Sequence, residues 1–126
     1  MFLNIKPNDV ILVVGLGNSH STPDSLGPRV LEQILVTRYL YLLGDVDKNY
    51  SNVSIFEANV VGNTGIESIS LLKKVVEEVC PTKVIIIYAL KANQKKRLVH
   101  TIQITNSGIH PGSGISNDQG EISIHT

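Results

Sequence analysis

Apolar positions along the chain form two kinds of pattern: short unbroken runs, and longer stretches with helical spacing. Unbroken β-branched runs at residues 10–15 and 84–88 predict strands that are covered on both faces. Residues 53–58 alternate in part and predict another strand, and residues 101–105 alternate clearly enough to predict a fourth. The strands are therefore expected to form a buried sheet.

Helical spacing of apolar residues separates these strands. One helix is expected over residues 24–43, ending at Gly44, and a second over residues 66–80. The order strand, helix, strand, helix, strand predicts an α/β fold, with a mostly parallel sheet in a three-layer sandwich. We expect one domain over residues 1–126, incomplete at its carboxyl end because the glycine-rich final residues add little core.

Polar residues before each helix are candidate caps. Thr22 or Asp24 can cap the first helix, and with Thr22 as the N-cap, Pro23 falls at the first helical position. Thr64 and Glu67 have the spacing of a capping box before the second helix. The sequence therefore predicts that both helices begin shortly after a strand ends.

Composition narrows the class of protein. Hydrophobic residues make up 42% of the chain and charged residues 17%, which is typical of a globular domain. The formal net charge is zero, so charge gives no reason to expect direct binding of nucleic acid or of a membrane, and self-association is expected. No targeting or membrane-spanning segment is recognisable, which favours a cytoplasmic protein. Cys80 is the only cysteine and is expected to be a buried or half-buried thiol.

Asp24 is the main candidate for chemistry. The turn Gly15-Leu16-Gly17 after the first strand lacks the third glycine of a dinucleotide-binding motif, because His20 stands there. Asp24 then follows, near the carboxyl edge of the sheet, where open α/β folds bind their ligands. It is either a helix-capping carboxylate or a group that carries out acid–base catalysis, and its position alone leaves both open.

Other polar residues also follow strand ends. They are Asn18, Asn59, Asn63 and Thr64. These side chains either bind the backbone of a substrate or only form turns. Among the histidines, His20 and His110 lie in loops that can reach the same edge, but no histidine has the spacing of a metal site, so neither a metal nor a cofactor is expected.

Five blocks in order along the chain match one pattern. They are 14–18 (Val-Gly-Leu-Gly-Asn), 22–28 (Thr-Pro-Asp-Ser-Leu-Gly-Pro), 64–67 (Thr-Gly-Ile-Glu), 101–104 (Thr-Ile-Gln-Ile) and 108–114 (Gly-Ile-His-Pro-Gly-Ser-Gly). Together they resemble the germination protease family of spore-forming bacteria. The resemblance implies a phosphorylase/hydrolase-like α/β sandwich, as in hydrogenase maturation peptidases. It also implies an aspartic-type endopeptidase that degrades small acid-soluble spore proteins during germination in the spore core, made as a zymogen and assembled as a homo-oligomer.

The resemblance also assigns residues. Asp24 matches the first aspartate of the family, and Asn18, Thr64, Tyr88 and His110 are expected to line the substrate cleft. The second aspartate of the family would end the third strand, where this chain has Tyr88. A pair of carboxylates works because proximity separates their two pKa values, leaving one group protonated and one able to activate water. We therefore expect impaired hydrolysis.

Two further hypotheses compete with an active protease. The first is a catalytically inactive homologue that binds peptide in the same cleft. The second is a metal-dependent enzyme that uses Asp24 with His20 or His110, as in the hydrogenase maturation relatives. Peptide binding that survives Asp24→Asn would favour the first, and stoichiometric metal in the purified protein would favour the second.

Overall fold

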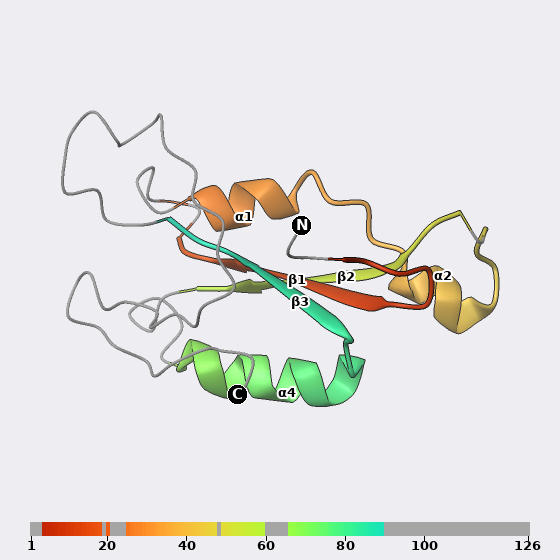
Figure 1. Ribbon diagram of the computed structural model, residues 1–126. Coiled ribbons are helices and arrows are strands. Elements are labelled where there is room, and N and C mark those ends of the chain that lie inside the picture. Colours follow the sequence, from red (N-terminus) through yellow and green to blue (C-terminus); the bar gives the residue numbers. More distant parts are fainter. Residues whose placement is uncertain (1–3, 19, 21–24, 48, 60–65, 90–126) are drawn as a thin grey trace.

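A computed structural model describes residues 4–18, 20, 25–47, 49–59 and 66–89 of the chain. Three strands, β1 (Val10–Leu16), β2 (Asn52–Ala58) and β3 (Lys83–Ile87), form a parallel sheet in the order β2-β1-β3 (Figure 1). The strands and their parallel arrangement confirm the α/β prediction. The predicted strand at 101–105 lies outside the described residues.

β1 is the central strand and the most buried element. It pairs with β2 on one side and β3 on the other, and six of its seven residues are buried. Leu12 and Val14 are completely inaccessible to solvent. Full burial of side chains of this size contributes about 1.5–3 kcal/mol each to the stability of the fold. The unbroken apolar run of β1 therefore fits its place at the centre of the sheet.

Helices cover both faces of this sheet. α4 (Ser68–Val79) packs on one face, where Leu72 joins a cluster with Leu12, Val14, Leu16 and Ala58. α1 (Leu26–Leu31) packs on the opposite face, where Leu31 contacts a second cluster that contains Ile11 and Val13. Figure 1 shows the sheet between α1 and α4. Alternate residues of each strand therefore face different helices.

The prediction of a single helix over residues 24–43 is wrong. The structure has α1, then a non-helical stretch, then the short α2 (Arg38–Leu43), which ends at Gly44 with φ of 74°. Thr37 interrupts the helix because it bonds to β2. Its N–H donates to the Val53 carbonyl at 2.9 Å, and its hydroxyl accepts from the Val53 N–H at 2.8 Å and donates to the Ser51 carbonyl. Side-chain hydroxyls compete with helical hydrogen bonds in this way.

The predicted caps are also wrong. α1 begins at Leu26, and Ser25 rather than Thr22 or Asp24 holds its N-cap position. α4 begins at Ser68 with Glu67 at its N-cap position, and the Glu67 side chain makes no capping hydrogen bond. The spacing of Thr64 and Glu67 suggested a capping box with Thr64 as the N-cap. The N-cap position of α4 is instead Glu67, three residues later.

At the amino edge of the sheet, Asp9 and Thr82 join β1 to the start of β3. The Thr82 hydroxyl donates to Asp9 Oδ1 at 2.8 Å, and the Lys6 N–H donates to Asp9 Oδ2 at 2.7 Å. Asp9 is 8% exposed. The backbone hydrogen bond from Lys6, followed by that from Thr82, lowers the pKa of the Asp9 carboxyl below its ordinary value.

Cys80 ends α4 in a left-handed conformation, with φ of 49°. Its side chain is exposed, so the expectation of a buried or half-buried thiol is wrong. None of the helices in the described ranges has the length and apolar character needed to cross a bilayer.

Candidate functional site

The start of α1 lies directly on the carboxyl ends of β1 and β3. A Cβ atom placed on Gly27 would lie 2.5 Å from the Leu16 carbonyl oxygen and 2.6 Å from the Ile87 carbonyl oxygen. A Cβ on Gly15 would lie 2.7 Å from the Gly27 carbonyl oxygen. No side chain fits between these backbones, so two glycines allow the helix to begin at this edge of the sheet.

The loop after β1 turns sharply at the same edge. Gly17 has φ of 137°, a conformation that favours glycine, and its N–H donates to the Ala58 carbonyl at 3.1 Å. The side-chain oxygen of Asn18 then accepts a hydrogen bond from the His20 N–H at 2.9 Å. Asn18 therefore stabilises a local turn and is half-buried beside the ends of β1 and β2.

The end of β2 is joined to the start of α4. The Ser68 hydroxyl donates to the Asn59 carbonyl at 2.8 Å, and Ser68 is only 3% exposed. This bond holds the first residue of α4 against the residue that follows β2. Ser68 was not predicted from the sequence, although a serine just before an apolar helical stretch is a common sign of a helix start.

Tyr88 follows β3 and faces α4. Its partly buried side chain packs against the cluster that contains Leu16, Ala58 and Leu72, whereas Ile87 packs on the opposite face with Ile11 and Val13. At the position where the family's second aspartate is expected, the chain thus has an aromatic side chain that contributes to the apolar core.

The structure brings some of the predicted residues together. Asn18 and Tyr88 lie at the carboxyl edge, next to the ends of the strands they follow. Asp24, Thr64 and His110 lie outside the described residues. Asp24 is nevertheless joined by one peptide bond to Ser25, the buried N-cap residue of α1. Ser25 and Gly27 were not singled out from the sequence, since only the packing of α1 on the sheet shows their importance.

Metal binding finds no support within the described part of the chain, where no three His, Cys, Asp or Glu residues are grouped closely enough to hold an ion. His20 is exposed, and its backbone N–H bonds to Asn18. The remaining groups named in the metal hypothesis, Asp24 and His110, lie outside the described residues, so that hypothesis stays a prediction.

Comparison with known proteins identifies the family. The sequence profile described as Germination protease matches residues 1–126. The chain belongs to the germination protease family. It is 46% identical over 126 residues to a germination protease of Bacillus subtilis (strain 168), and 45% identical over 126 residues to one of Priestia megaterium. A third, from Caldanaerobacter subterraneus subsp. tengcongensis, is 49% identical over 115 residues.

These matches cover most of this chain but a smaller share of each relative. The first two cover 98% of the chain and 34% of the relative, and the third covers 90% of the chain and 36% of the relative. The chain therefore spans about a third of the length of the germination proteases it matches. The family resemblance read from the sequence blocks is confirmed.

Proposed function

We propose that the chain is an aspartic-type endopeptidase that acts on small acid-soluble spore proteins in the spore core during germination. Its site is the carboxyl edge of the sheet, with Asp24 as the catalytic carboxylate. The observation that carries the proposal is the family match over residues 1–126. The start of α1 at the ends of β1 and β3 adds support, because Asp24 directly precedes Ser25 at that start.

In this proposal, the Asp24 carboxylate activates a water molecule for attack on the peptide carbonyl. The substrate backbone is held by Asn18, Thr64 and His110. The Asn18 side-chain oxygen already accepts the His20 N–H, which leaves the Asn18 amide NH₂ group to donate to a substrate carbonyl. Tyr88 supplies a hydroxyl that donates a hydrogen bond but no second carboxylate. Hydrolysis is therefore slow in the chain as it stands.

A second candidate function is supported by the packing of Tyr88. Because Tyr88 lies against the apolar cluster beneath α4, the end of β3 provides an aromatic surface where the proposed mechanism needs an acid. A homologue that binds peptide without cleaving it would need the cleft but not that acid.

The test is incubation of the purified chain with a small acid-soluble spore protein, with fragments followed by mass spectrometry. We expect slow cleavage by the parent chain, none by Asp24→Asn, and faster cleavage by Tyr88→Asp. Binding without cleavage in all three proteins would favour the inactive homologue. Rapid cleavage by the parent chain that depends on Asp24 would show that Tyr88 does not impair the reaction.

We also propose that residues 1–126 fold as one domain and that the chain assembles as a homo-oligomer. The near balance of positive and negative charge supports association, because copies of the chain do not repel one another strongly. Sedimentation velocity over a range of protein concentrations measures the assembly, and a single monomeric species throughout would contradict it.

A further inference from the structure

The outer edge of β2 is the side that faces away from β1. Its backbone groups are hydrogen-bonded at the beginning of the strand and unpaired towards its end, within the described residues. Val53 directs its N–H and C=O away from β1, because both bond to Thr37. The Ala58 carbonyl points the opposite way, towards the chain that follows β1. Peptide groups alternate in direction along a strand, so Ile55 and Glu57 also point outward. Within the ranges that the structure describes, these outward groups of Ile55 and Glu57 have no hydrogen-bond partner.

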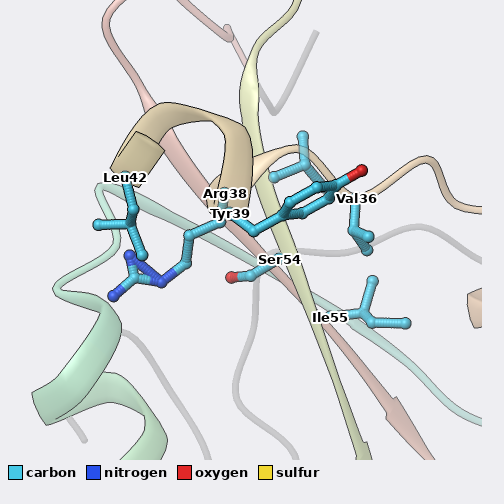
Figure 2. Close-up of a pocket in the computed structure, with 7 residues that line it drawn as sticks. Val36, Arg38, Tyr39, Leu42, Ser54 and Ile55 are labelled. Carbon is cyan, nitrogen blue, oxygen red and sulfur yellow. The ribbon is translucent and has the colours of Figure 1, made fainter. Parts of the chain in front are cut away.

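A shallow apolar groove lies beside this edge, between α2 and β2 (Figure 2). It has a volume of about 380 Å³, and its apolar lining comes from Val36, Tyr39, Leu42, Val53 and Ile55. Tyr39 is 56% exposed and Leu42 is 72% exposed. Exposed apolar side chains gathered beside an open strand edge are typical of a surface that binds another polypeptide.

We propose that an extended segment of the protein substrate docks on the outer edge of β2 as an added strand, with one apolar side chain in the α2–β2 groove. This inference rests on the proposed function. The outward N–H and C=O groups of Ile55 and Glu57 recognise an extended backbone, while the groove selects a side chain. The edge continues into Ala58 and Asn59, beside the loop after β1. A strand bound there therefore runs along the sheet to the candidate site.

The same edge is poorly suited to pairing with a second copy of itself. In an antiparallel pair related by a two-fold axis, outward-pointing residues face each other. An axis at Ile55 would place Glu57 opposite Val53, whose backbone is already bonded to Thr37. An axis at Phe56 would place Glu57 of one copy opposite Ile55 of the other, so that a carboxylate would face an apolar side chain. An axis at Glu57 would place two carboxylates opposite each other, which is destabilising.

Glu57 adds a chemical preference. Its side chain is exposed on β2 beyond the apolar groove. A substrate segment with an apolar residue for the groove and a lysine or arginine farther along suits both features, because opposite charges across a strand pair attract. The preferred segment is thus extended, apolar at one position and basic at another.

The test uses Glu57→Pro and Glu57→Thr in the full chain, each combined with Asp24→Asn so that binding is measured without cleavage. Proline removes the outward N–H of residue 57 but no hydrogen bond between β1 and β2. Threonine removes the carboxylate and keeps the N–H. Fluorescence anisotropy with fluorescein-labelled β-casein, a protein without a stable fold, gives the Kd. We expect the proline variant to bind about fivefold more weakly than the threonine variant, the factor that one hydrogen bond of ordinary net strength supplies.

A second variant protects the test against misfolding. Leu42→Lys changes a 72% exposed position on α2, so it should leave the fold intact while placing a charge in the groove. We expect it to raise the Kd for β-casein by about fivefold or more, since one buried apolar side chain contributes at least that factor. Circular dichroism of each variant shows whether the fold is retained.

Several results would overturn the docking site. They are equal Kd values for Glu57→Pro and Glu57→Thr, no effect of Leu42→Lys, or no binding of β-casein by the Asp24→Asn chain. A change in sedimentation without a change in β-casein binding would assign the edge to a second copy instead. Failure of the proposed hydrolysis looks different: the binding differences would persist, while the unmodified chain would leave spore protein intact.

Discussion

The carbonyl oxygen of Gly27 lies 2.7 Å from the place that a Cβ atom on Gly15 would occupy. The two glycines therefore form a contact between α1 and β1 in which backbone meets backbone. The contact also fixes where α1 begins along the sheet, with Ser25 at its N-cap position.

Gly27→Ala is expected to destabilise the protein. The added methyl group would lie 2.5 Å from the Leu16 carbonyl oxygen and 2.6 Å from that of Ile87, so α1 has to move away from the sheet. Overpacking of this kind costs about 1–3 kcal/mol. Urea denaturation gives the free energy of unfolding. Gly44→Asn is the matched control, because a Cβ atom placed on Gly44 would meet no atom within 4 Å and asparagine tolerates its left-handed conformation.

Stability is expected to depend on the charge of Asp9. Hydrogen bonds from Lys6 and Thr82 lower the pKa of the Asp9 carboxyl in the folded protein, so the ionised form favours folding. This contribution is present above the unfolded pKa of about 3.9 and is lost as pH falls through the lower folded value. Parent and Asp9→Asn proteins should therefore differ in stability at pH 7 and converge below about pH 4. Urea midpoints across this range measure the difference, and a constant gap would contradict the assignment.

Thr37→Val should weaken the attachment of α2 to β2. Valine keeps the shape of threonine but leaves the Val53 N–H and the Ser51 carbonyl without their side-chain partner. An unsatisfied polar group costs about 1–3 kcal/mol where it is buried, and we expect a loss of about that size. Thr37→Ser keeps the hydroxyl and should lose much less. Thermal unfolding compares the two variants, and equal losses would show that the methyl group matters more than the hydrogen bonds.

Tyr88→Phe separates the role of the ring from that of the hydroxyl. The ring packs against the cluster beneath α4, and phenylalanine preserves that packing. We expect the free energy of unfolding to change by less than about 0.5 kcal/mol, as for a substitution that leaves core contacts in place. Substrate binding should weaken if the hydroxyl contacts the peptide, as proposed. Unchanged affinity for a spore protein in the Asp24→Asn background would restrict Tyr88 to a structural role.

The sequence predicted the strands well because each has a strong local pattern. β1 is buried on both faces, and β3 contributes partly buried residues to both, which leaves a continuous apolar signature in each strand. The helices were predicted less well. The apolar spacing over 24–43 continues through Thr37, but hydrogen bonds to β2, which is distant in sequence, end the helical conformation there. Local periodicity carries no information about such a partner.

The positions of two candidate site residues were predictable from the order of strands and helices. Parallel strands bring the residues that follow them to one edge, which correctly placed Asn18 and Tyr88. The sequence did not reveal that Tyr88 belongs to the apolar layer under α4, or that Ser68 ties α4 to Asn59. Both depend on which face each strand presents and on where α4 begins. The predicted roles of all five candidate site residues, Asn18, Asp24, Thr64, Tyr88 and His110, stay predictions.

The register of the sheet keeps the strand ends level. Gly15 is aligned with Glu57 on one side and with Ile87 on the other, so all three strands reach the carboxyl edge in the same row. The ends of the three strands therefore form one level row. Changes in the length of one loop can therefore alter what is recognised without shifting the pairing of the strands, and related proteins can diverge in selectivity while keeping one rigid platform.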